Sequence, residues 1–251
     1  MKIQFIMNVM EINQNIAEYY DELYPVTDEQ KKFYEKKMNN FSAPVKFLRI
    51  GCGTGSFEHS LARDGSDVTG IETSPELLES ANRKRRTQLM SVRYFHMSSL
   101  EMGRFLGKNF YNIISILDGR IAFTHDNTLM AKLFYDCREL ISDGGFLIVT
   151  LPNFERYTGQ EDFYLPLHKS IRASLSSHIA QKDGTFYLNQ KLETGNGKKL
   201  TVTEDAPINM LIKEDLKKYA LDAGFKNVEF FEGFNLAPLT QESQNVLAVI
   251  S

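Results

Sequence analysis

Three glycines and one glutamate form the clearest chemical pattern in the chain. Gly51, Gly53 and Gly55 alternate directly after the apolar run that begins at Phe47, and Glu72 ends the next apolar run. Glycine lets a turn adopt positive φ and lets a ligand approach the backbone closely. A carboxylate about 20 residues after such a turn can accept hydrogen bonds from both hydroxyls of a ribose. The pattern predicts a site for a nucleoside-containing ligand.

The spacing of the glycines separates the classes of nucleoside ligand. A dinucleotide site takes the form G-x-G-x-x-G, whereas Ser56 stands at the third glycine place and the glycines run G-x-G-x-G. The turn also has no phosphate-binding lysine of the kind found in a P-loop. The spacing therefore favours a nucleoside without a pyrophosphate.

Strand-like and helix-like segments alternate around this turn, which predicts a parallel sheet with helices on both faces. One predicted helix begins at Thr73 or Ser74 with Pro75 in its first turn, and another runs from Thr128 to the pair Gly144-Gly145. In an open sheet of this kind a ligand binds beyond the carboxyl ends of the strands. The expected strands are Val45–Ile50, Val68–Glu72, Val92–Met97, Tyr111–Leu117 and Gly145–Leu151.

The second half of the chain departs from this rhythm. Between Phe154 and Met210 we expect two strands joined by a turn at Gly195-Asn196-Gly197. A final helix then precedes the closing strands Val228–Phe231 and Val246–Ile250. The sequence thus predicts an N-terminal helical segment or lid over residues 1–42 and one domain over residues 43–251, with an inserted hairpin or cap at about 155–210.

Composition limits the class of protein and of partner. The chain has 251 residues, a formal net charge of −3 and two cysteines. These values favour a globular protein of a reducing compartment, the cytoplasm, and do not favour nucleic acid as the default partner. No stretch approaches the length that spans a membrane, and no signal peptide is expected at the start. A homodimer is compatible with the sequence.

Several stretches resemble, in order and spacing, the successive motifs of class I S-adenosylmethionine-dependent methyltransferases. They are "LRIGCGTG", "GIETSPELLESA", "YNIISIL", "CRELISDGGFLIVTLPN" and "IKEDLKKYALDAGF". The resemblance covers roughly Asn15 to Asn153 and Met210 to Ile250, which is most of the chain. It implies an α/β Rossmann-like fold, a seven-stranded, mostly parallel sheet with the last strand antiparallel, and S-adenosyl-L-methionine as the cofactor.

The resemblance also implies roles for individual residues. Gly51, Gly53 and Gly55 would line the methionine part of the cofactor, and Glu72 would hold its ribose. Ser98 and Ser99 stand where the family often has an acidic residue near the adenine amine, and Leu117 and Asp118 match the segment facing the transferred methyl. "YYDELY", which begins at Tyr19, is similar to a helix whose tyrosines close over the cofactor. The set of cofactor residues also includes Tyr20, Arg49, Cys52 and Thr73.

Arg49 departs from the family, which usually has an acidic residue at this place. Three explanations are open: a bidentate pair with the carboxylate of the cofactor, a structural ion pair with a neighbour, or a site that has lost affinity. Because an unpaired buried guanidinium is costly, we expect Arg49 to have a partner. The structural pair is the explanation that we favour.

Methyl transfer needs chiefly a nucleophile held in line with the methyl group, and a general base only where the acceptor carries a proton. Asp118 and His125 are the candidate catalytic residues, although His125 and Asp126 could equally only begin the next helix. "LDGR" after the fourth strand lacks the Asn/Asp-Pro-Pro-aromatic run of enzymes that methylate exocyclic base nitrogens. In this region the chain is loosely similar to small-molecule N-methyltransferases of the glycine and sarcosine type.

The sequence therefore predicts a methyltransferase that acts on an N or O atom of a small molecule. A non-catalytic cofactor-binding or regulatory protein with the same fold is the alternative. Arg49 and the missing acidic residue at Ser98 are the features that favour this alternative. No metal site is expected, because no histidine or cysteine lies at metal-ligand spacing.

Overall fold

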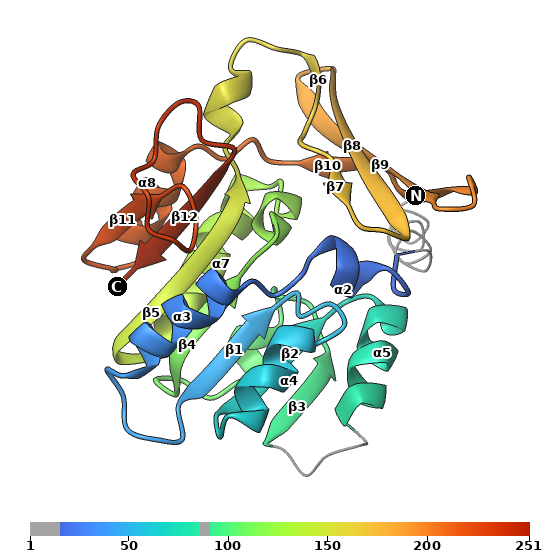
Figure 1. The fold of residues 1–251 in the computed structure, drawn as a ribbon. Coiled ribbons are helices and arrows are strands. Elements are labelled where there is room, and N and C mark those ends of the chain that lie inside the picture. The colour runs from blue at the N-terminus through green and yellow to red at the C-terminus, as the bar shows by residue number, and fades with distance from the viewer. Residues whose placement is uncertain (1–15, 86–90) are drawn as a thin grey trace.

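The computed structural model describes residues 16–85 and 91–251. Its centre is a seven-stranded sheet (Figure 1) built from β1 (Lys46–Ile50), β2 (Asp67–Glu72), β3 (Val92–His96), β4 (Tyr111–Ile116), β5 (Ile141–Pro152), β11 (Val228–Phe231) and β12 (Asn245–Ile250). The strand order is β11-β12-β5-β4-β1-β2-β3, and β12 runs antiparallel to both of its neighbours while the remaining pairs are parallel. The predicted fold class is confirmed, and the predicted strand positions agree with the structure to within a few residues.

Helices cover both faces of this sheet. They are α2 (Tyr20–Leu23), α3 (Asp28–Met38), α4 (Ser56–Arg63), α5 (Pro75–Arg85), α6 (Met102–Phe105), α7 (Asn127–Leu140) and α8 (Lys213–Asp222), with short 3-10 turns η1 (Arg120–Phe123) and η2 (Phe154–Tyr157). Successive strand residues point to opposite faces, so Phe47 packs in one hydrophobic cluster with α3 and α4 while Leu48 packs in another with α7. Figure 1 shows α3 and α4 in front of the sheet. Every helix in the described ranges is too short or too polar to cross a membrane.

The end of α7 differs from the prediction. The sequence placed the helix end at Gly144-Gly145, but α7 ends at Leu140 and β5 begins at Ile141. The glycine pair instead lies in an irregular part of β5, where the register with β4 shifts and Gly144 has φ +70°. A Cβ on Gly145 would lie 2.8 Å from the Asn112 carbonyl oxygen. The glycines are therefore needed for a bulge in the strand and not for a helix exit.

A second sheet, which we call the cap sheet, occupies residues 162–208. It consists of β6 (Asp162–Tyr164), β7 (His168–Lys169), β8 (Ala173–Lys182), β9 (Thr185–Thr194) and β10 (Lys199–Ile208). The order is β10-β9-β8-β6, and β7 also pairs with β8. The predicted hairpin is present as β9 and β10 with its turn at Gly195–Gly197, but the sequence analysis missed β8 and the two short strands. In Figure 1 the cap sheet stands above the carboxyl ends of β1 and β2.

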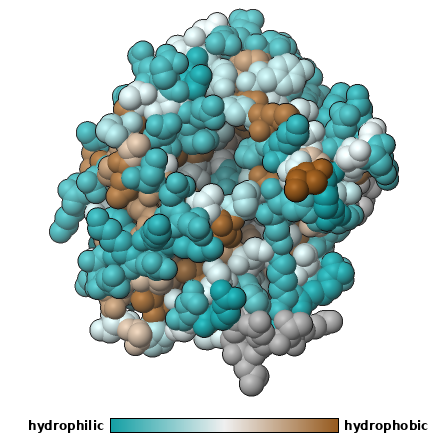
Figure 2. Space-filling model, in the orientation of Figure 1, coloured by the Kyte–Doolittle hydropathy of each residue, from teal (hydrophilic) through white to brown (hydrophobic). Residues whose placement is uncertain are grey.

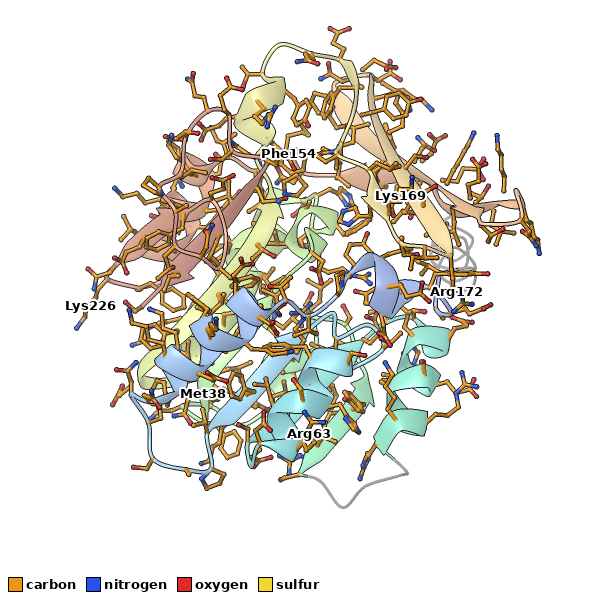
Figure 3. All side chains as sticks on the ribbon, viewed as in Figure 1. Met38, Arg63, Phe154, Lys169, Arg172 and Lys226 are labelled. Carbon is orange, nitrogen blue, oxygen red and sulfur yellow. The ribbon has the colours of Figure 1, made fainter. Side chains whose placement is uncertain are left out.

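Helix α2 joins the cap sheet to the rest of the molecule. Leu23 packs with Leu175 and Leu192 of the cap sheet and with Leu77 of α5 in one buried cluster. Arg172, which Figure 3 labels at the lower end of the cap sheet beside α2, forms ion pairs with Glu22 at 2.8 Å and with Glu18. The cap sheet is thus held to α2 by both apolar packing and charge.

Candidate active site

A cavity of about 640 Å³ lies between the carboxyl ends of the parallel strands and the cap sheet. Its volume is in the range of small-molecule binding sites. Figure 2 shows a mainly hydrophilic surface that is hollowed near the centre of this face. The structure brings together around this cavity the predicted residues Tyr20, Gly51, Glu72, Thr73, Ser98, Ser99, Asp118 and His125.

The other predicted site residues do not line this cavity. Arg49 and Cys52 face a separate small cavity of about 40 Å³, which Tyr20 and Asp118 also line. The remaining three are Gly53, Gly55 and Leu117. Leu117 is buried in the hydrophobic core. Gly55, with φ +71°, precedes α4, and a Cβ there would lie 2.7 Å from Cζ of Tyr94. The packing of the Tyr94 ring therefore explains Gly55 without a ligand.

Glu72 is held in a cage of backbone N–H groups at the end of β2. Its Oε1 accepts hydrogen bonds from the Thr73 and Ser74 N–H groups at 2.8 and 3.1 Å, and its Oε2 accepts one from the Gly53 N–H at 2.9 Å. Burial raises the pKa of Glu72, but the charge of Arg120 and the three N–H donors outweigh it, so the pKa is lowered. Glu72 is therefore an ionised acceptor at the cavity wall, held in one orientation by three N–H groups.

Tyr20 and Arg120 lie directly over the glycine turn. A Cβ on Gly53 would come 2.7 Å from the Tyr20 ring, and a Cβ on Gly51 would come 3.1 Å from Cγ of Arg120. Arg120 Nη2 lies 3.5 Å from the Tyr20 hydroxyl and 4.0 Å from Oε2 of Glu72. Burial raises the pKa of Tyr20 to about 12, so its hydroxyl stays neutral. The sequence analysis did not include Arg120 in the site, because an arginine in a loop has no spacing signal that distinguishes it from a solvated one.

Arg49 forms an ion pair within the protein. Its Nη2 lies 2.9 Å from Oδ2 of Asp118, and its Nε lies 3.8 Å from Oε1 of Glu58 on α4. Arg49 and Glu58 are both buried. Burial lowers the pKa of Arg49, but the carboxylates of Asp118 and Glu58 outweigh it and raise the pKa, so the guanidinium stays charged. The expected partner of Arg49 thus exists, and it consists of two carboxylates.

Three rings in successive tilted contact lead from the glycine turn to the cap sheet. The centroids of Tyr20 and Tyr24 are 5.0 Å apart, and those of Tyr24 and His168 are 4.7 Å apart. His168 Nδ1 lies 3.1 Å from the Leu23 carbonyl oxygen. Because a carbonyl only accepts, Nδ1 carries the proton of this hydrogen bond. Tyr24 and His168 both line the cavity. Tyr24 belongs to the predicted "YYDELY" segment, although only Tyr20 was named among its site residues, and His168 was not predicted to be part of the site.

His125 and Asp126 lie between η1 and α7. The Asp126 side chain caps α7 by accepting a hydrogen bond from the Leu129 N–H at 2.9 Å. His125 is exposed and lines the cavity. The helix-start interpretation therefore applies to Asp126, while His125 is placed where it can meet a ligand. Within residues 16–85 and 91–251, no cluster of three or more His, Cys, Asp or Glu side chains could hold a metal ion.

Known proteins similar to this chain are methyltransferases. Residues 47–145 match the methyltransferase domain family. A putative methyltransferase of Geobacillus sp. (strain WCH70) is 24% identical over 94% of this chain and 98% of its own. Two solved structures are similar in fold. The CcbJ methyltransferase from Streptomyces caelestis has a TM-score of 0.77, 17% identity and coverage of 96% and 97% of the two chains.

The second structure is an S-adenosylmethionine-bound amino pentose methyltransferase of Micromonospora echinaspora, involved in calicheamicin biosynthesis. Its TM-score is 0.66 with 16% identity, and the match covers 93% of this chain and 96% of that one. At these identities the solved structures support the fold, and the family match over β1 to β5 supports the activity. Residues 47–145 therefore match a methyltransferase domain, and the chain has the fold of class I S-adenosylmethionine-dependent methyltransferases.

Proposed function

We propose that the protein transfers a methyl group from S-adenosyl-L-methionine to an N or O atom of a small molecule bound under the cap sheet. The observation that carries this proposal is the placement of Glu72 and of Gly51, the first glycine of the turn, in the wall of one cavity that continues to the cap sheet. Oε2 of Glu72 accepts one N–H, from Gly53, and a carboxylate oxygen can accept two hydrogen bonds. A ribose hydroxyl therefore has an acceptor at this place.

The remaining cofactor contacts follow from the same placement. Gly51 would contact the methionine part, with Tyr20 and Arg120 beside it, and Gly53, which the Tyr20 ring covers, would support the site from behind. Ser98 and Ser99, which lie just after β3 in the cavity wall, would meet the adenine. Thr73 adjoins the ribose site through its N–H to Glu72. Arg49, Cys52, Gly55 and Leu117 would support the site from behind, because none of them lines this cavity.

The bound cofactor supplies an electrophilic methyl group, and the chain would position the acceptor in line with it. Asp118 follows β4 with φ 58°, and its backbone N–H donates to Oγ1 of Thr150 at 3.0 Å. This arrangement fixes the loop that faces both the cofactor and the acceptor. His125 is the candidate to take a proton where the acceptor carries one.

The first experiment is calorimetric titration with S-adenosylmethionine and S-adenosylhomocysteine. We expect micromolar binding by the wild-type protein. Glu72→Gln should lower the affinity about 10- to 100-fold, because hydrogen bonds to a charged group contribute more than those to a neutral one. Glu79→Gln on the exposed face of α5 is the matched control and should bind like the wild type. Absence of binding by folded wild-type protein would contradict the proposal.

The second candidate is a non-catalytic protein that binds the cofactor. The proximity of Arg120 to Glu72, 4.0 Å in the site itself, favours it. Incubation with methyl-labelled S-adenosylmethionine and a panel of neutral, basic and acidic small molecules separates the two. Label transfer to any acceptor supports the enzyme, whereas cofactor binding without transfer to any member supports the binding protein.

The organisation of the chain is part of the proposal. We infer one methyltransferase domain over residues 43–251, into which residues 155–210 are inserted as a cap. The predicted N-terminal lid over residues 1–42 stays a proposal, and its residues 1–15 lie outside the described part of the chain. The two cysteines are free and buried, which suits a reducing compartment such as the cytoplasm. Size-exclusion chromatography with light scattering would test whether the protein is a homodimer.

A further inference from the structure

We propose that the half of the cavity under the cap sheet accepts an uncharged, largely apolar molecule that donates a hydrogen bond to Gln190. This inference rests on the proposed function and names the class of its acceptor. It follows from the apolar walls, from the pairing of the charged groups and from a polar ladder in the cap sheet.

The walls of this half are aliphatic or aromatic and belong to the main hydrophobic core. Each long strand of the cap sheet contributes at least one aliphatic side chain, and the parallel sheet, η2 and α7 close the opposite side. All of these side chains are buried. The residues are Ile179, Leu188, Ile208, Leu133, Leu151 and Phe154. Such a surface binds apolar groups through the hydrophobic effect and offers nothing to a hydrated ion.

The charged groups around the cavity already have partners or lie at its rim. Among the described lining residues, Arg120 is the one permanent cation, and it is placed against Glu72 and the Tyr20 hydroxyl. Asp118 is paired with Arg49. Glu232 is exposed. An anionic acceptor would therefore lose its hydration without gaining a counter-ion in the described part of the wall, which is unfavourable.

The two lining histidines do not change this balance. His168 uses Nδ1 to donate to the Leu23 carbonyl oxygen, and His125 is exposed between η1 and α7. Neither forms an ion pair with another lining residue in the described ranges. A neutral imidazole can accept from a hydroxyl or amine of the acceptor, which is compatible with an uncharged ligand.

One polar ladder crosses the apolar inner face of the cap sheet. Gln190 on β9 is paired in register with Ser177 on β8 and with Thr203 on β10. Its Nε2 donates to Oγ of Ser177 at 2.9 Å, and its Oε1 accepts from Oγ1 of Thr203 at 2.9 Å. All three residues line the cavity. The ladder thus places a carboxamide among aliphatic side chains at the ligand surface.

The hydrogen-bond inventory of Gln190 leaves one position for a ligand. A carboxamide has two N–H donors and an oxygen that can accept two hydrogen bonds. Ser177 takes one donor, and the carboxamide also opposes the burial that raises the pKa of Tyr24. Thr203 uses one of the two acceptor positions of Oε1. The second acceptor position is free for a hydroxyl or N–H of the acceptor molecule, which would orient an otherwise apolar ligand.

The test uses three naphthalene compounds that share one apolar body and differ in charge. The full-length protein, saturated with S-adenosylhomocysteine, is titrated in a calorimeter with 2-naphthol, 2-naphthyl phosphate and 2-naphthylmethylammonium. We expect 2-naphthol to bind at least tenfold more tightly than either charged compound. Equal or tighter binding of a charged compound, or no binding of 2-naphthol at millimolar concentration, would overturn the inference.

Two matched variants test the role of the ladder. Gln190→Leu should weaken 2-naphthol binding about three- to tenfold, the effect of one neutral hydrogen bond. Gln181→Leu makes the same change on β8 outside the cavity wall and should bind 2-naphthol like the wild type. An equal effect of the two substitutions would overturn the assignment of Gln190.

The affinity for S-adenosylhomocysteine provides the check on folding and on the proposed function. Both glutamine variants should retain the wild-type affinity, since Glu72 and the glycine turn are unchanged. Loss of 2-naphthol binding with this affinity intact concerns the acceptor site alone. If the wild-type protein does not bind S-adenosylhomocysteine, the proposed function fails first, and the acceptor assignment fails with it.

Discussion

Arg49 at the end of β1 and Asp118 just after β4 form an ion pair with a separation of 2.9 Å between Nη2 and Oδ2. The two strands are neighbours in the sheet, with Arg49 in register with Ser115. The pair therefore ties together the carboxyl ends of two central strands, directly beneath Tyr20. At a place where the sequence resemblance leads us to expect an acidic residue, the partners of Arg49 are the carboxylates of Asp118, just after β4, and of Glu58 on α4.

Replacing Arg49 with Met should destabilise the fold more than it weakens cofactor binding. The substitution leaves the Glu58 carboxylate buried without its cation, and breaking a buried pair in this way costs about 3 kcal/mol. We expect a corresponding fall in the free energy of unfolding, measured by urea denaturation. Affinity for S-adenosylhomocysteine should fall less than about threefold, a value typical of an indirect effect.

The double variant Arg49→Met with Glu58→Gln is the control for this explanation. Gln carries no buried charge, so the second substitution should recover at least half of the lost stability. If Arg49→Met instead kept full stability and lost cofactor affinity tenfold or more, Arg49 would be a cofactor ligand. The structural ion pair would then not be its main role.

Replacing Arg120 with Met should make cofactor binding more sensitive to acid. Burial raises the pKa of Glu72, and the Arg120 charge is the largest influence that lowers it. Without that charge the pKa rises, so Glu72 loses its carboxylate form at a higher pH. The midpoint of the fall in affinity on acidification should therefore move to higher pH, measured by titration with S-adenosylhomocysteine across a pH series.

The folded state of the Arg120→Met variant should also become more sensitive to acid. A carboxyl whose pKa is lowered on folding contributes stability above its ordinary pKa, and this contribution is lost as the pH falls through the folded value. Arg120→Met should thus begin acid unfolding at a higher pH than the wild type. Arg120→Lys keeps the charge and should resemble the wild type, and equal curves for Met and wild type would refute the role of Arg120.

Replacing Gly55 with Ala should cost about 3 kcal/mol of stability, since both positive φ and a clash oppose it. Its Cβ would come 2.7 Å from Cζ of Tyr94 and 3.0 Å from the Cβ of Ala81. Gly184→Ala is the matched control, because Gly184 has φ +79° but no atom within 4 Å of its new Cβ. This control should cost only about 1 kcal/mol. Equal losses in thermal denaturation would show that packing against Tyr94 contributes nothing.

Substitutions of Asp126 and His125 should distinguish a residue that caps a helix from one that takes part in catalysis. Asp126→Ala removes the hydrogen bond to the Leu129 N–H and should lower the free energy of unfolding by about 1 kcal/mol. His125→Gln should leave stability nearly unchanged and lower turnover on a protonated acceptor about 100-fold, the usual contribution of a general base. Turnover unaffected by His125→Gln would remove His125 from the mechanism.

The sequence predicted the parallel sheet and the candidate cofactor site because their signals are local. The apolar run before Gly51 fixes β1, and the alternation of glycines and the distance to Glu72 are read along one short stretch. The start of helix α7 was predicted to within one residue, at Thr128 where the helix begins at Asn127, because its apolar residues recur three or four apart. The end of α7 was not predicted correctly, because two adjacent glycines are equally compatible with a helix end and with a strand bulge. Only pairing with β4 distinguishes the two.

The partners of Arg49 and the acceptor half of the cavity could not be predicted in the same way. Asp118 lies 69 residues from Arg49, so only the adjacency of β1 and β4 brings the two together. Strand β8 alternates buried and half-buried residues, but Ser177 breaks the apolar pattern at the point where the ladder to Gln190 forms. The polar residue that weakened the strand signal is the one that faces the cavity.

The strands of the cap sheet hydrogen-bond to one another in a sheet separate from the seven-stranded one. Inward-facing residues such as Leu188 and Gln190 can therefore be exchanged without disturbing the ladders that hold β1 and β2 around the glycine turn. In the proposed function, the cap sheet contacts the acceptor and the glycine turn contacts the methyl donor. New side chains on three cap strands would then change which acceptor binds without altering the residues that hold the donor.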